Sequence, residues 1–157
     1  MNNIFDRYYK RYDAWYERNK FAFLSEIEAL KKLLPAKKRG LEIGAGTGRF
    51  TQALGIAHGI DPSKNMIKIA RKRGLNVRLA CGERLPFKNN SFDYAAIIIT
   101  ICFTRRPEQV LQEAHRVLKK KAGLSWGSWI RIAFSVNSIR EKIACFISRP
   151  AFLVSGR

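Results

Sequence analysis

The stretch from Leu41 to Phe50, LEIGAGTGRF, places three glycines at alternate positions directly after a short apolar run. Glycine reaches positive φ without a Cβ penalty and lets another molecule contact the main chain. A run compatible with a helix follows from Arg49 to Leu54. The stretch therefore predicts a strand, a tight turn and a helix, with a ligand lying across the turn. Such a unit opens a doubly wound α/β sheet.

The spacing of the glycines indicates which ligand. The pattern is Glu42-x-Gly44-x-Gly46-x-Gly48, whereas the dinucleotide fingerprint is G-x-G-x-x-G. It resembles motif I of class I S-adenosylmethionine-dependent methyltransferases, in particular the small UbiE-like type. An acid suits a cofactor that carries a sulfonium and an ammonium, and suits a pyrophosphate poorly. An NAD-dependent oxidoreductase is therefore the less favoured reading, and a purely structural glycine turn is the alternative without a ligand.

The resemblance implies a binding site for S-adenosyl-L-methionine. Gly44, Ala45, Gly46 and Gly48 would cradle its methionine part, and Glu42 would support the turn. A second strand, Ile56 to Ile60, stops at Asp61, which lies 13 residues after Gly48. An acid there is placed to accept hydrogen bonds from ribose hydroxyls. The alternative role of Asp61 is to cap the helix that follows Pro62 and Ser63.

The segment from Cys81 to Phe87 resembles the loop that borders the adenine in this family, often written G-D-A-E-x-L-P-F. Cys81 stands where the family has an aspartate, and a thiol is a poor acceptor. We expect the backbone of Cys81 and Gly82, together with Glu83 and Leu85, to border the adenine.

The first forty residues predict two helices. Six aromatic residues recur at helical spacing in the first: Phe5, Tyr8, Tyr9, Tyr12, Trp15 and Tyr16. Such a stripe must be covered, either by the body of the domain or by closing over a ligand. The Tyr12-Asp13-x-Trp15-Tyr16 segment resembles the lid of small methyltransferases, so residues 1–36 are expected to form a helical lid. A second helix is expected from Lys20 to Leu34, ended by Pro35.

A nearly continuous apolar strand is predicted from Phe92 to Ile101, as at the centre of a parallel sheet. Thr100, Cys102 and Phe103 follow at the edge where open α/β sheets bind ligands, and either line an apolar substrate pocket or pack the strand end. A helix is expected from Pro107 to Leu118. The predicted fold class is a three-layer, Rossmann-like, doubly wound α/β domain with a mainly parallel sheet. The resemblance to the methyltransferases implies the strand order 3-2-1-4-5.

Beyond Lys119 the likeness to the family ends. We expect one domain over 1–157, with a cofactor-binding core at 37–127 and a basic, apolar tail at 128–157. The tail has room for a fifth strand and a helix, and the C-terminal antiparallel hairpin of the family is expected to be missing. Our hypothesis is that a truncation or frameshift after about residue 120 produced the tail.

The net charge of +18 is spread along the chain, which favours solvated surface and leaves RNA as an alternative partner. No apolar run reaches the roughly 20 residues that span a bilayer, so a cytoplasmic location without membrane contact is predicted. The spacing of the three cysteines fits no metal site and indicates buried thiols. The predicted function is methyl transfer from S-adenosylmethionine to an unidentified acceptor, with a small molecule favoured. The alternative is a truncated, non-catalytic domain that binds cofactor or RNA. No catalytic base and no oligomeric state can be assigned from the sequence.

Overall fold

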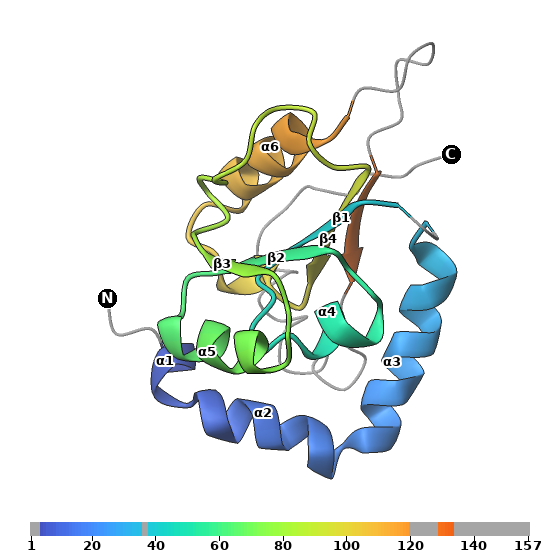
Figure 1. Ribbon diagram of the computed structural model, residues 1–157, viewed down its shortest axis with the longest axis vertical. Coiled ribbons are helices and arrows are strands. Elements are labelled where there is room, and N and C mark those ends of the chain that lie inside the picture. The colour runs from blue at the N-terminus through green and yellow to red at the C-terminus, as the bar shows by residue number, and fades with distance from the viewer. Residues whose placement is uncertain (1–3, 36–37, 120–128, 134–157) are drawn as a thin grey trace.

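The computed structural model describes residues 4–35, 38–119 and 129–133. Five strands in these ranges form one sheet in the order β3-β2-β1-β4-β5, and all neighbouring strands are parallel (Figure 1). The strands are β1 (Gly40–Ile43), β2 (His58–Asp61), β3 (Val77–Leu79), β4 (Tyr94–Ile98) and β5 (Trp129–Ala133). The predicted fold class and strand order are confirmed.

Helices cover both faces of the sheet, which gives the three predicted layers (Figure 1). In chain order they are α1 (Ile4–Arg7), α2 (Tyr9–Arg18), α3 (Lys20–Leu33), α4 (Arg49–Ala53), α5 (Lys64–Lys72), the 3-10 helix η1 (Ile101–Phe103) and α6 (Pro107–Val117). Helix α6 packs on one face, and helices α2 to α5 pack on the other.

Strand β4 shows why its sequence is apolar without alternation. Ala95 and Ile97 lie in the cluster under α6, whereas Ala96 and Ile98 lie in the cluster under α2, α3 and α4. All five residues of the strand are buried. A central parallel strand is covered on both faces, so both sets of side chains must be apolar.

Strand β4 is shorter than the sequence predicts. It ends at Ile98 because Ile99 adopts φ 54°, a left-handed conformation that β-branched residues rarely take. Thr100 and η1 then leave the sheet. The apolar run continues to Ile101 because that side chain is buried in the core beside α6, although it is no longer part of a strand.

The aromatic stripe of the N-terminal segment is divided between two helices. The helix is interrupted at Tyr8, between α1 and α2. Tyr8 is 45% exposed, so it does not join the buried face that the spacing predicts. Tyr16 is 5% exposed and packs edge-to-face on Phe23 and Phe50. These contacts seat α2 and α3 against α4.

The predicted tail contributes β5 to the sheet, next to β4. The other expectations for the tail, including a helix, the missing hairpin, the frameshift and the state of Cys145, lie outside the described residues. Among the described residues, no helix combines the length and apolar character needed to cross a membrane.

Candidate functional site

The glycine turn joins β1 to α4 and uses conformations that favour glycine. Gly44, Gly46 and Gly48 have φ values of 81°, 55° and 82°. The amides of Gly44 and Ala45 both donate to the Ile60 carbonyl at 2.9 Å, which fastens the turn to the end of β2. The turn is therefore a fixed bend at the carboxyl ends of two neighbouring parallel strands, where open α/β sheets bind ligands.

Two of these glycines are also required by close packing. A Cβ on Gly48 would clash with the Leu75 side chain, and a Cβ on Gly44 would clash with Thr100. A Cβ on Gly46 would lie 3.4 Å from the Tyr12 ring.

Asp61 ends β2 and binds the glycine turn directly. One carboxylate oxygen accepts from the Gly46 amide at 2.9 Å, and the other accepts from the Ser63 amide at 2.8 Å. Burial raises the pKa of Asp61, and the two amide hydrogen bonds oppose that shift. A carboxylate offers about four lone-pair sites, so two remain for other donors.

Glu42 lies at the centre of β1 and is 1% exposed. Its carboxyl accepts a hydrogen bond from the Thr51 hydroxyl at 2.5 Å, which ties β1 to α4 behind the turn. Burial raises the pKa of Glu42 to about 8. The side chain is therefore mostly protonated at neutral pH in the protein without ligand, and it supports the turn as a hydrogen-bonding group.

The loop after β3 divides its residues between surface and core. Cys81 is exposed, which contradicts the expectation of a buried thiol, and Glu83 is partly buried. Gly82 is buried, and a Cβ there would lie 3.0 Å from Ile43 Cγ2. Leu85 is 4% exposed in the core beside α6, and its amide donates to Glu113 at 2.7 Å. Leu85 therefore anchors this loop in the core, and it lines a pocket together with Cys81, Pro86 and Phe87.

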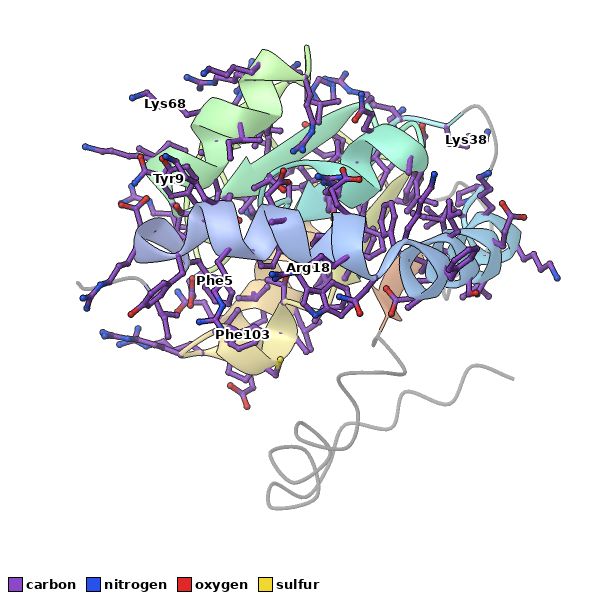
Figure 2. All side chains as sticks on the ribbon, turned by 90° about the horizontal axis from the view of Figure 1, so that it is seen from below. Phe5, Tyr9, Arg18, Lys38, Lys68 and Phe103 are labelled. Atoms are coloured by element: carbon purple, nitrogen blue, oxygen red, sulfur yellow. The ribbon has the colours of Figure 1, made fainter. Side chains whose placement is uncertain are left out.

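The N-terminal aromatics meet the glycine turn and the end of β4. Tyr12 lies over Gly46, and its hydroxyl is 2.9 Å from that of Tyr16. Burial raises the pKa of Tyr12 to about 12, so this hydroxyl stays protonated at neutral pH. Phe5 packs on Phe103 with ring centroids 4.9 Å apart, and Figure 2 shows the two residues on adjacent segments.

The other residues expected at the lid and pocket have different surroundings. Trp15 and Tyr16 pack against the core cluster that holds α3 and α4, so they seat α2 on the domain. The Thr100 hydroxyl donates to the Ile98 carbonyl at 2.9 Å and lies 3.3 Å from the Gly44 carbonyl, so this side chain joins the segment after β4 to the turn. Cys102 is partly buried and Phe103 is 49% exposed.

The structure adds residues that the sequence reasoning did not assign to the site. Asp13 on α2 accepts hydrogen bonds from Thr47, Arg49 and Arg73. Burial alone raises the pKa of Asp13, but the bonds from Arg49 and Arg73 outweigh it and hold the pKa well below its usual range. The signal in the sequence was its place within the Tyr12-to-Tyr16 segment; its partners are 34 to 60 residues away. No group of three potential metal ligands occurs within the described part of the chain.

A comparison with protein families identifies the family to which this fold and this glycine turn belong. Residues 41–125, which are more than half of the chain, match a family described as Methyltransferase domain. This chain belongs to that family. The match begins at β1 and includes the glycine turn, Asp61 and the Cys81 loop.

Individual relatives of this methyltransferase support the assignment. An uncharacterised protein of Methanocaldococcus jannaschii is 46% identical over 140 residues, which are 89% of this chain and 68% of the relative. A Thermotoga maritima crystal structure described as a SAM-dependent methyltransferase, possible histamine N-methyltransferase, is 46% identical with a TM-score of 0.77. That match covers 84% of this chain and 60% of the Thermotoga chain. A demethylmenaquinone methyltransferase of Geobacillus is 29% identical, over 76% of this chain and 58% of the relative.

S-adenosyl-L-methionine is the cofactor of this family, and the site fits it at two points. Asp61 keeps acceptor capacity beyond its two amide donors, as a ribose diol requires. Gly46 has no side chain, and the Tyr12 ring packs over it, so a ligand along the turn would lie against main chain beside Tyr12.

Proposed function

We propose that this methyltransferase domain binds S-adenosyl-L-methionine across the glycine turn and transfers its methyl group to a small-molecule acceptor. The observation that supports the proposal most directly is the bond between Asp61 and the Gly46 amide. This bond joins the group expected to hold the ribose to the turn expected to hold the methionine part. A single ligand that spans the two sites would be positioned by one rigid unit.

The bound cofactor supplies an already activated methyl group on a sulfonium, so the protein need only align the acceptor and exclude water. The residues at the site suit those tasks. Tyr12 covers the turn, and its hydroxyl stays neutral at physiological pH. Cys102 and Phe103, in η1 after β4, offer apolar surface to an acceptor.

A small-molecule acceptor is supported by two of the relatives. Their names include histamine and demethylmenaquinone, which are both small molecules, although of different polarity. The chain spans 60% and 58% of those two proteins, so neither acceptor is carried over to it.

Calorimetry with S-adenosylhomocysteine tests the proposal. We expect the wild-type protein to bind one equivalent, and Asp61→Asn to weaken binding by roughly tenfold to a hundredfold, because an amide NH₂ replaces one acceptor oxygen.

Asp93→Asn is the matched control. Asp93 also accepts a main-chain hydrogen bond, from Arg39 at 2.8 Å, but it lies just before β4, at the opposite edge of the parallel sheet. Equal losses of affinity in both variants would contradict the proposal. So would a folded wild-type protein that does not bind S-adenosylhomocysteine. Binding without methyl transfer to any acceptor in a small-molecule panel would favour the non-catalytic alternative.

A further inference from the structure

Helix α2 is fastened to the cofactor turn by one carboxylate. Asp13 accepts from the Thr47 hydroxyl at 2.6 Å, from Arg49 Nε at 3.0 Å and from Arg73 Nη2 at 2.8 Å. Arg73 also donates to the Thr47 carbonyl at 2.5 Å. We call these four residues, Asp13, Thr47, Arg49 and Arg73, the Asp13 clamp.

The partners of Asp13 belong to three different segments. Thr47 lies within the glycine turn, Arg49 is the first residue of α4, and Arg73 is the C-cap of α5. In the structure these contacts form with α2 packed on the domain and with the glycines of the turn in left-handed conformations. The clamp therefore joins the position of α2 to the conformation of the turn.

The clamp is sheltered from solvent. The side chains of Asp13, Arg49 and Arg73 are only 17% to 20% exposed. Removing one charge from such a partly buried group leaves the others unpaired, which costs far more than breaking an exposed ion pair.

Tyr12 precedes Asp13 in the sequence, so the clamp fixes the residue that covers the turn. The Tyr12 ring lies beside Gly46, and its hydroxyl is hydrogen-bonded to Tyr16 on the next turn of the helix. Figure 2 looks onto α2, which runs across the view, and α4 and α5, which carry or adjoin its partners, lie above it in the view.

We propose that Asp13 is a positioning residue that couples closure of α2 to cofactor binding by holding Tyr12 over the glycine turn. The inference rests on the proposed function, because it assigns to Asp13 the closed state of that same site. Asp13 does not act on the cofactor itself; it acts through Tyr12 and Thr47.

The test combines calorimetry with hydrogen exchange on the full chain, using S-adenosylhomocysteine as the probe. In the wild-type protein the ligand should slow amide exchange in α2 and in the turn. In Asp13→Asn we expect binding to weaken by about tenfold or more, and the ligand no longer to protect α2. If Asp13 only stabilised the fold, its substitution would change amide exchange in α2 and in the turn together, and the ligand would still slow exchange in both.

Glu17→Gln is the matched control. Glu17 lies one helical turn further along α2 and also pairs with Arg49, but its side chain is 66% exposed. An exposed pair contributes little, so this variant should retain wild-type affinity and protection.

A second variant keeps the proposal testable if Asp13→Asn fails to fold. Arg73→Lys keeps a cation near Asp13 and loses the two-pronged contact, so it should give a smaller loss in the same direction. If a folded Asp13→Asn or Arg73→Lys protein matches Glu17→Gln in affinity and in α2 exchange, the coupling is wrong while the cofactor site stands. A wild-type protein that does not bind the probe would overturn both proposals.

Discussion

At the scale of single residues, the carboxyl of Glu42 is held in its protonated form at a pH where an exposed carboxyl is ionised. It is almost fully buried with Thr51 as its hydrogen-bond donor, and burial raises its pKa to about 8 from an ordinary value of 4.5. The folded protein therefore favours the protonated acid. The resulting stabilisation is fully present below about pH 4.5 and is lost as the pH rises towards 8.

We predict that Glu42→Gln changes this dependence on pH. The amide imitates the protonated acid, so the variant should be more stable than the wild-type protein at pH 9, by an amount on the order of a few kcal/mol. The difference should shrink below pH 5. Urea unfolding across this range measures it, and parallel profiles for the two proteins would contradict the buried-acid interpretation.

A second prediction at this scale concerns Gly48. Alanine there must adopt φ 82° and also displace the Leu75 side chain, so Gly48→Ala should cost about 2 kcal/mol of stability or more and weaken S-adenosylhomocysteine binding. Gly55→Ala is the control, because Gly55 has φ 64° but no atom within 4 Å of a Cβ. It should lose only the backbone part, about 1 kcal/mol, and keep its affinity. Equal affinity losses in the two variants would show that packing at Gly48 is irrelevant to the site.

At the scale of elements, α1 is held by the first turn of α5. Asp6 accepts from the Ser63 hydroxyl at 2.6 Å and from the Asn65 amide at 2.9 Å, while the Ser63 hydroxyl in turn accepts from the Met66 amide. Hydrogen bonds from Ser63 and Asn65 lower the pKa of Asp6. Anionic groups are favoured at a helix N-terminus, so this position suits a carboxylate.

We predict that Asp6→Asn loosens α1 without disturbing α2. Amide exchange in residues 4–8 should become faster, and exchange in residues 9–18 should stay close to that of the wild-type protein, because the Asp13 clamp is intact. Glu108→Gln, in the first turn of α6, provides a comparison away from α1. Faster exchange throughout 4–18 would mean that the two helices are released together.

At the scale of the whole molecule, the sheet that carries the glycine turn is packed against helices on both faces. Ala96 and Ile98 pack towards α2, α3 and α4, while Ala95 and Ile97 pack towards α6.

A ligand that bridges the turn and Asp61 binds the folded chain and not the unfolded one. We therefore predict that S-adenosylhomocysteine at 100 times its dissociation constant adds about 2.7 kcal/mol to the free energy of unfolding. Thermal unfolding with and without ligand measures this, and an unchanged midpoint would contradict binding at the turn.

The sequence by itself determined the fold class and the glycine turn, because these depend on local signals. The strand order was implied by the resemblance of the motifs to the family, and the structure has that order. Three alternating glycines after an apolar run predict a tight turn after a strand. An apolar run without alternation predicts a central strand covered on both faces, and the structure has both. The position of Asp61 at the end of the second strand was predicted in the same way, and β2 ends there. The exposure of Tyr8 and of Cys81 was not, because neither the break between α1 and α2 nor the surface position of the loop has a local signature.

Only the tertiary structure decided how the N-terminal helices meet the turn. Asp13 was one acid among charged neighbours until folding brought Thr47, Arg49 and Arg73 to it. The left-handed Ile99, which ends β4 and turns the chain so that Thr100 contacts Gly44, has no local signal either. Both features arise from contacts between distant segments, whose energies are set by burial and by partners that spacing along the chain does not specify.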